Sequence, residues 1–416
     1  MARKAGGLEI GLATVDITPP VGVTLSGYKP RISQAVAHKL RTEALVCRGP
    51  RGRAWALVTS DIIGYPGRYV KLLRQKISRA TGLTQRAIMI SATHTHSGPT
   101  MLAFGEEASA ADRAYHKELL KRLVALVKAA RRDLRPGWFE TAWAQAPALG
   151  SNRRVQLADG TWGNEWEDHE GRHPGYFDPT VLLVGVRRPD ASLAALLVNF
   201  GMHPVTLGPK SLDISPDYVG YMKDALESRG QVGVAMFALA GAGNINPRVC
   251  IQVGAEHPRA AGERLADIVV EALSKLAPVP AGTVAAHVEP WRLKRTREAF
   301  RHKDRPGRRV GDIIKSEFQV LRAGELGLVG LPGELFSEFS RKLRHMSPFG
   351  QTAVVSLAND YVGYLPTDAA QGEGAYEVKC APCAGLEGMI IERAGRAFAA
   401  FGGRGRARGA RKRRSR

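Results

Sequence analysis

Two histidines separated by one residue mark the stretch best suited to chemistry. Residues 91–99 read Ser-Ala-Thr-His-Thr-His-Ser-Gly-Pro and continue an apolar run that is typical of a buried strand. Because alternate residues of an extended chain share a face, His94 and His96 can point the same way. One imidazole could then bind a metal ion while the other transfers a proton. Two hydrogen-bonded histidines that only close a strand are the alternative interpretation.

Other reactive side chains follow strands in the same way. His203, Glu334 and the pair Tyr361 and Tyr364 each come soon after an apolar run. About three nitrogen or oxygen ligands and one open position describe a catalytic zinc site, and scattered ligands at strand ends agree with that description. The motifs His-Glu-x-x-His and Gly-x-Ser-x-Gly are absent, which excludes a thermolysin-type site and argues against an α/β-hydrolase serine. Asp61 also ends an apolar run and is a candidate to approach the His94 turn, unless it caps the next element.

A loop of small residues adds a candidate binding element. Residues 240–247 read Ala-Gly-Ala-Gly-Asn-Ile-Asn-Pro, where backbone N–H groups can approach a ligand closely. The loop lacks Gly-x-Gly-x-x-Gly and a Walker lysine, which argues against a nucleotide site. Cys380 and Cys383 form a single Cys-Ala-Pro-Cys, half of a zinc-ribbon site. We interpret them as two reduced thiols in a loop, with metal binding or redox cycling as the alternative.

The elements that must position these groups alternate between strands and helices. Periodic apolar residues predict helices, and apolar runs between them predict buried strands. The main predicted helices lie at residues 68–81, 111–134, 217–227, 260–275 and 386–399. This alternation predicts a mixed α/β domain.

Two stretches are predicted to contain little regular structure. Residues 151–176 are polar and rich in Gly, Trp, His and acidic residues, and a loop of this length in a compact domain is usually functional or mobile. Its two histidines, His169 and His173, have no helical context and are not predicted as ligands. Residues 278–305 are expected to form a connection with one strand at 283–288.

Length and composition indicate an ordinary soluble protein. The chain has 416 residues, 44% of them hydrophobic and 24% charged, which is enough for one large or two modest domains. No apolar run approaches 18 residues, so no transmembrane helix is expected. The N-terminus has no signal-peptide core, and we therefore expect a cytoplasmic location. Four cysteines exclude a disulfide scaffold in a chain of this length.

The chain is strongly basic, with a net charge of +21. Residues 402–416 contain eight basic and no acidic residues, so most of the excess is spread over the rest of the chain. This Gly/Arg-rich tail is predicted to be disordered. By charge alone it could contact nucleic acid or another anionic surface weakly, although a solvated tail is the favoured interpretation.

The ordered motifs of the chain resemble the neutral/alkaline non-lysosomal ceramidase family. The most specific match is the nine-residue stretch at 91–99 described above. The other matches follow the family's order between about residues 8 and 400: Val-Asp-Ile-Thr-Pro at 15–19, Gly-Tyr at 27–28, Asn-Arg at 152–153, Gly-Met-His-Pro at 201–204, Asp-Tyr-Val-Gly-Tyr at 217–221, Gly-Asn-Ile-Asn-Pro at 243–247, Pro-Gly-Glu at 332–334, and residues 358–367.

The resemblance implies the neutral-ceramidase type of α/β fold and a zinc-dependent amidohydrolase. Position by position, it implies the zinc ligands His94, His203, Glu334 and Tyr364. His96 corresponds to the family's second histidine, which contacts the reacting group, and would act as the general acid/base. Arg153 corresponds to an arginine near the polar end of the substrate. Zinc lowers the pKa of bound water to about 7 and polarises an acyl carbonyl, which fits amide hydrolysis.

Two positions depart from the family pattern. The family carries Asp and Ser where this chain has Asn244 and Asn246. Because both lie in the loop beside the reacting centre, we include them with His96 and Tyr364 among the candidate catalytic residues. Full-length family members also add a C-terminal immunoglobulin-like domain and usually a secretion signal, and we expect this chain to lack both.

We therefore predict a single ceramidase-like zinc hydrolase domain at residues 1–401, followed by the disordered tail at 402–416. Its substrate would be a small-molecule acyl amide, such as a lipid-like one, with an ester as the alternative. One alternative keeps the fold and the metal pocket but has lost catalysis, with Asn244 and Asn246 as its support. The other alternative is a nucleic-acid-associated protein that uses the basic surface and tail.

Overall fold

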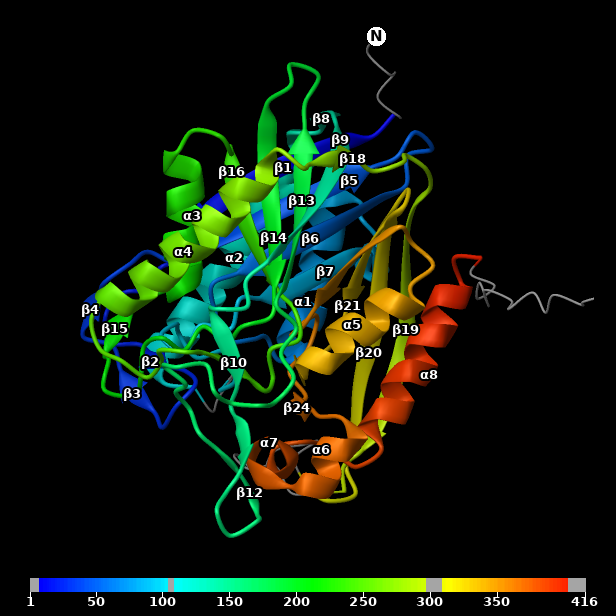
Figure 1. Cartoon of the computed structure of the whole chain (residues 1–416). Helices are drawn as coiled ribbons and strands as arrows, with labels where there is room; N and C mark the ends of the chain where they lie inside the picture. The colour runs from blue at the N-terminus through cyan, green and yellow to red at the C-terminus, as the bar shows by residue number, and fades with distance from the viewer. Residues whose placement is uncertain (1–6, 104–107, 297–308, 403–416) are drawn as a thin grey trace, which may run out of the picture.

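Three large sheets form the framework of the computed structural model, which describes residues 7–103, 108–296 and 309–402 (Figure 1). The first sheet has the order β7-β6-β5-β1-β8. Helix α1 contacts α2, and α2 packs on β1 and β5. The elements of this unit are β1 (Glu9–Asp16), β5 (Arg41–Arg48), β6 (Ala54–Ser60), α1 (Gly67–Thr81), the 3-10 turn η1 (Gln85–Ala87), β7 (Ile88–Ala92), α2 (Ala110–Arg132) and β8 (Arg135–Pro136).

The second sheet has the order β16-β14-β13-β9-β18, with α3 and α4 packed together outside it (Figure 1). Its elements are β9 (Trp138–Gln145), β13 (Thr180–Arg187), β14 (Leu193–Phe200), α3 (Tyr218–Ser228), β16 (Val234–Leu239), α4 (Glu256–Leu273) and β18 (Ala277–Pro278).

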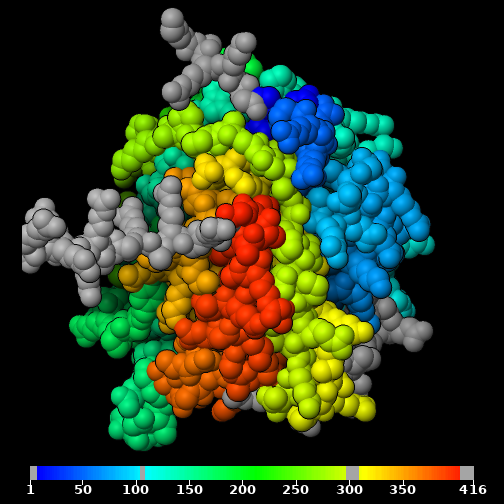
Figure 2. Space-filling view, turned by 90° about the vertical axis from the view of Figure 1, so that its right-hand side faces the viewer, coloured from blue at the N-terminus to red at the C-terminus, as the bar shows by residue number. Residues whose placement is uncertain are grey.

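The third sheet has the order β19-β20-β21-β23, and helix α8 lies along its outer face, as Figure 2 shows in red. Its elements are β19 (Val284–Lys294), β20 (Ile313–Ala323), β21 (Leu326–Gly330), α5 (Ser337–Met346), β23 (Gln351–Val355) and α8 (Leu386–Ala399).

Each sheet contains one parallel strand pair joined by a crossover helix. These units are β6-α1-β7, β14-α3-β16 and β21-α5-β23, and the other strand pairings described in the three sheets are antiparallel. Loops that bind ligands commonly follow the carboxyl ends of such strands. Apart from Arg153, which lies between β10 and β11, the candidate residues predicted above follow β7, β14, β16, β21 and β23, so the three units place them at the same end of the molecule.

Side chains of the central strands alternate between two cores. In β6, Ala56 and Val58 face a core shared with the helices, whereas Trp55 and Leu57 face a core between the sheets. The inner core receives residues from all three sheets, such as Met89, Leu197 and Leu328 on one strand of each. Because these strands are buried on both faces, they appear in the sequence as continuous apolar runs.

Short strands shape the end of the molecule that carries the site. They are β2 (Thr24–Leu25), β3 (Arg31–Ile32), β4 (Ala35–Val36), β10 (Gly150–Asn152), β11 (Arg154–Gln156), β12 (Trp162–Asn164), β15 (Asp213–Ile214), β17 (Ile245–Pro247), β22 (Glu334–Leu335) and β24 (Tyr364–Leu365). Two short helices, α6 (Asp368–Glu373) and α7 (Ala375–Lys379), lie beside the β11–β12 hairpin (Figure 1).

The expected mixed α/β architecture is confirmed, and the helix predicted at 386–399 has these bounds in the structure. Residues 151–176, predicted as a long loop with little regular structure, contain the end of β10 and the short strands β11 and β12. The strand expected at 283–288 extends to Lys294, since Trp291 and Leu293 are buried and alternate with exposed charged residues. No described helix is long and apolar enough to cross a membrane. Residues 403–416 of the predicted tail lie outside the described residues.

Candidate metal centre

His94 occupies a strained position directly after β7. Its φ is +79°, in the left-handed region that non-glycine residues rarely adopt. The backbone N–H of His94 donates to the carbonyl of Ile62, and its Nδ1 lies 2.6 Å from the carbonyl oxygen of Ile63. The turn after β6 therefore fixes both the backbone and the ring of His94.

A buried ion cluster of Asp61, Lys223 and Glu43 lies directly before this turn. The Asp61 carboxylate receives hydrogen bonds at 2.8 Å from Nζ of Lys223 in α3 and one at 2.9 Å from the backbone N–H of Arg41. Lys223 also contacts Glu43 at 2.9 Å, and its side chain has no exposed surface. Asp61 thus lies directly before the residues that hold His94, while its predicted influence on the site stays a prediction.

His203 follows β14 and is fixed by the small-residue loop. Its Nδ1 lies 2.5 Å from the carbonyl oxygen of Ala242. A Cβ at Gly201 would lie 2.4 Å from the carbonyl oxygen of Gly241, and a Cβ at Gly243 would lie 2.5 Å from that of Glu334. These glycines therefore let the backbones that carry His203 and Glu334 approach this loop.

Glu334, which follows β21 of the third sheet, contacts both His94 and His203. Its Oε2 lies 3.0 Å from Nε2 of His203 and 3.3 Å from Nε2 of His94, while Tyr361 donates a 2.5 Å hydrogen bond to Oε1. Burial by itself would raise the pKa of the Glu334 carboxyl, but His94 and His203 bring it well below its usual value. The buried carboxylate is therefore ionised at neutral pH.

The donor atoms fit a divalent metal ion. Since Nδ1 of both His94 and His203 faces a backbone carbonyl, each Nδ1 carries a hydrogen and each Nε2 is the ring atom directed at Glu334. A proton on Nε2 makes such a contact a hydrogen bond, and a divalent cation bound between the rings and the carboxylate would take the place of that proton. Imidazole tautomers fixed by backbone carbonyls are also the usual environment of metal-bound histidines.

His96 completes the cluster but is held differently. Its Nε2 lies 3.4 Å from Nε2 of His94, and candidate ligand atoms of these two residues and His203 all lie within 4.8 Å of one another. Its buried Nδ1 has no hydrogen-bond partner in the described part of the chain. Burial, with the neighbouring His94 and His203, lowers the pKa of His96 well below 6.5. The ring is therefore neutral at pH 7.

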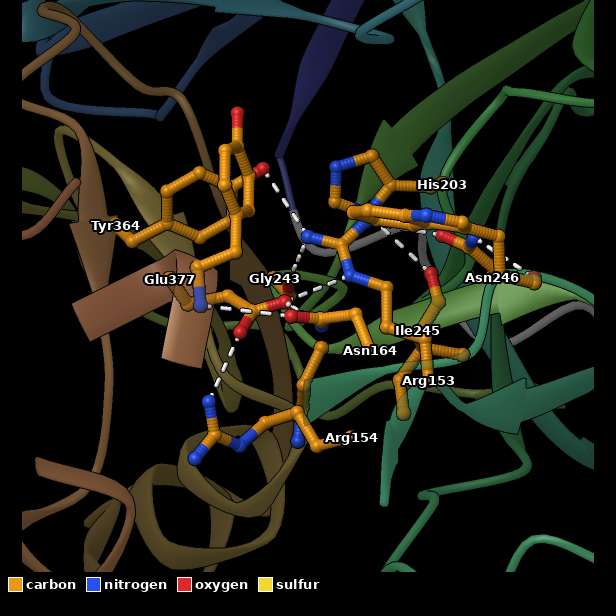
Figure 3. A network of polar contacts seen from close by, with 12 residues as sticks. Arg153, Arg154, Asn164, His203, Gly243, Ile245, Asn246, Tyr364 and Glu377 are labelled. Carbon is orange, nitrogen blue, oxygen red and sulfur yellow. Dashed lines mark hydrogen bonds and ion pairs between the residues drawn. The ribbon is translucent and has the colours of Figure 1, made fainter. Parts of the chain in front are cut away.

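Tyr364 lies beside Glu334, because β22 and β24 pair in parallel with these residues in register. Burial, followed by the charge of Glu334, raises the pKa of the Tyr364 hydroxyl well above 10. Arg153 donates a 3.1 Å hydrogen bond from Nη2 to the Tyr364 hydroxyl, as Figure 3 shows. The predicted ligand Tyr364 and the predicted substrate-binding Arg153 thus contact each other.

The two asparagines of the small-residue loop have different environments. Asn246 accepts a 3.0 Å hydrogen bond from Nη1 of Arg153 and donates to the carbonyl of Trp166. The side chain of Asn244 instead contacts the start of α5, accepting from the Ser337 N–H and donating to Glu338. Asn246 therefore belongs to the polar network of the site, whereas Asn244 anchors a helix.

Sequence reasoning missed two contributors to this region. Tyr361 was grouped with Tyr364 but not recognised as the donor to Glu334, and Glu377, which binds Arg153, was not considered. Glu377 lies in the short helix α7 and belongs to no sequence motif, so only the fold reveals its contact with Arg153. His173, in the polar segment 151–176, contacts Asn152 and Glu165 and not the histidine cluster.

Comparison with known proteins places this site in context. The family model described as neutral/alkaline non-lysosomal ceramidase, N-terminal, matches residues 8–263. The neutral ceramidase of Pseudomonas aeruginosa is 24% identical over 266 residues, which cover 59% of this chain but only 38% of that relative.

Solved structures show the same fold. The crystal structure of neutral ceramidase from Pseudomonas aeruginosa superposes with a TM-score of 0.77 and 17% identity, covering 95% of this chain and 75% of the other. A ceramidase complexed with C2 gives a TM-score of 0.75 and 16% identity, over 94% and 75% of the two chains.

Proposed function

The chain belongs to the neutral/alkaline non-lysosomal ceramidase family, and from this premise we propose that it is a zinc-dependent hydrolase of an acyl amide bond. The substrate would be ceramide-like, with an acyl chain on an amide nitrogen. The observation that carries the proposal is the convergence of Nε2 of His94 and Nε2 of His203 on the buried carboxylate of Glu334. Such a set of nitrogen and oxygen ligands fits a divalent cation.

The residues divide into a binding set and a proton-transfer group. His94, His203, Glu334 and Tyr364 would hold the zinc ion. When bound, zinc supplies a water molecule of lowered pKa and polarises the acyl oxygen. The neutral His96, whose Nε2 lies 3.4 Å from Nε2 of His94, would accept a proton from water and pass it to the leaving amine.

Arg153 and Asn246 would define the polar end of the pocket. Four of the five N–H hydrogens of Arg153 are donated to Glu377, Asn246, Gly243 and Tyr364. A bidentate grip on a carboxylate needs two parallel N–H groups, so Arg153 can offer a substrate only a single hydrogen bond in this arrangement. This fits a neutral hydroxyl or amide better than a charged end group.

The metal site is tested by elemental analysis of the purified protein beside His94→Ala and Glu334→Ala. We expect about one zinc ion per chain in the wild type and loss of most of it in both variants, because each substitution removes a ligand. The matched control is His169→Ala, which removes an exposed histidine that pairs with Glu167 at 3.5 Å outside the cluster. It should retain zinc.

Hydrolysis is measured on the same samples with N-acyl amides of short and long acyl chains. Activity should disappear with a chelator and return with added zinc. Wild type that stays metal-free after zinc is supplied would refute the zinc hydrolase. Zinc binding without turnover of any amide or ester would favour the alternative of a family member that has lost catalysis.

A further inference from the structure

A buried carboxylate joins two neighbouring arginines next to the site. Glu377 in α7 has no exposed surface, and its Oε1 accepts a 2.8 Å hydrogen bond from Nε of Arg153 while its Oε2 accepts one at 2.9 Å from Nη1 of Arg154. Asn164 of β12 donates a third hydrogen bond, at 2.8 Å, to Oε1. Figure 3 shows the carboxylate between the two guanidinium groups.

In this arrangement the charges of Arg153 and Glu377 depend on each other. Burial opposes ionisation of Glu377, but Arg153 and then Arg154 lower the pKa of its carboxyl below the usual value. Arg153 is itself buried, so each charge depends on the other for compensation. Removing one partner of a buried pair leaves the other charge unpaired, which is strongly unfavourable.

The contact at Nε determines where the rest of the Arg153 guanidinium points. The group is planar, so fixing its Nε edge on Glu377 directs Nη1 toward Asn246 and Nη2 toward the Tyr364 hydroxyl. Arg153 also lies over the rings of Trp166 and Tyr364, at 5.2 and 5.6 Å from the ring centroids. These contacts leave the guanidinium a single orientation.

We propose that Glu377 is a positioning residue for the metal centre: through Arg153 it fixes the Tyr364 hydroxyl beside Glu334. It does so by tying the β11–β12 hairpin to α7, so that this segment forms a fixed wall of the site. The inference rests on the proposed function for its metal, but the geometry that it describes involves only residues of this chain.

The matched variants are Glu377→Gln and Glu373→Gln. Glu377→Gln keeps the shape of the side chain but removes the charge between the arginines. Among the described residues, Glu373 forms an ion pair with Arg154 alone, at 2.9 Å, and its side chain is 29% exposed, so Glu373→Gln removes one ion pair of the same cluster without changing a contact of Arg153. Both variants remove one carboxylate charge near the arginines. Only Glu377→Gln removes the carboxylate that orients Arg153, so the difference between the two variants measures that orientation.

Zinc affinity, measured by competition with a chromophoric chelator, is the main readout. We expect Glu377→Gln to weaken binding by about 10- to 100-fold, as is typical when the residues that support metal ligands are removed, and Glu373→Gln to bind like the wild type. Combined with Tyr364→Phe, Glu377→Gln should add little further loss, because both changes remove the same contribution. Wild-type affinity in Glu377→Gln, equal losses in the two Gln variants, or fully additive losses with Tyr364→Phe would overturn the proposal.

Two further measurements keep the outcome decisive. If Glu377→Gln does not fold, Arg153→Lys retains the charge opposite Glu377 but removes the hydrogen bond to Tyr364, and it should show the same loss and the same lack of additivity. If the wild type binds no zinc, the proposed function fails, and crystal structures of the two Gln variants then decide. The Arg153–Tyr364 contact should be broken only in Glu377→Gln, and its survival there would refute the positioning role.

Discussion

His96 differs from the other clustered histidines in what its ring contacts. Nδ1 of His94 and of His203 faces a backbone carbonyl, whereas the flank of His96 packs against Gly27 and the ring of Tyr28, with centroids 5.1 Å apart. A Cβ at Gly27 would lie 2.3 Å from the His96 ring, so only glycine fits there. Because Nδ1 of His96 has no hydrogen-bond partner among the described residues and its Nε2 faces the cluster, the ring remains available for proton transfer.

Replacing His96 by glutamine should separate catalysis from metal binding. We expect kcat for an N-acyl amide to fall about 10²- to 10⁴-fold, the usual contribution of a general acid/base, while zinc content stays near that of the wild type. Both quantities are measured on one preparation. Loss of zinc together with activity would instead assign His96 to the ligand set.

At the scale of elements, close backbone contact sets how the first helix layer sits on its sheet. A Cβ at Gly11 of β1 would lie 1.9 Å from the carbonyl oxygen of Ala130 in α2. The helix therefore packs on the strand at a distance that only glycine permits. Gly395 of α8, by contrast, is exposed, and a Cβ there would meet no other group within 4 Å.

Alanine at these two glycines should have opposite effects on stability. Gly11→Ala is expected to lower the free energy of unfolding by about 1–3 kcal/mol, because α2 must move away from the sheet. Gly395→Ala is expected to raise it by up to about 1 kcal/mol, since alanine favours the helix. Urea unfolding of both variants measures this, and equal effects would contradict the packing argument.

At the scale of the whole molecule, the cores and the site both join the three sheets. The inner core takes side chains from each sheet, and the proposed ligands follow β7, β14, β21 and β23. If one sheet unfolded, it would therefore expose the inner core and separate the proposed ligands from one another. One domain at residues 1–401 stays a prediction, which thermal unfolding can test.

The protein should accordingly unfold in one transition, with a ratio of calorimetric to van't Hoff enthalpy of about 1. Saturating zinc should shift that whole transition to higher temperature, because the ion binds only the folded chain. Differential scanning calorimetry of metal-stripped and zinc-loaded protein measures both effects. Two resolved transitions, with zinc moving only one of them, would show that the sheets unfold separately.

The amino-acid sequence by itself determined the class of the fold and the identity of the clustered side chains. Apolar runs and helical periodicity are local patterns, so strands such as β7 and helices such as α8 could be predicted from them. The stretch around His94 and His96 is equally local, and its family resemblance is confirmed by the comparison over residues 8–263.

Only the tertiary structure decided how these side chains meet. His94 and Glu334 are 240 positions apart in the chain, yet their Nε2 and Oε2 atoms lie 3.3 Å apart because three separate β-α-β units end on one side of the molecule. The ion pair between Arg153 and Glu377 joins a hairpin to a short helix across a similar separation. In both pairs, the sequence around one residue does not indicate which residue it contacts. Hydrogen bonds and ion pairs depend on distances that only the folded backbone sets.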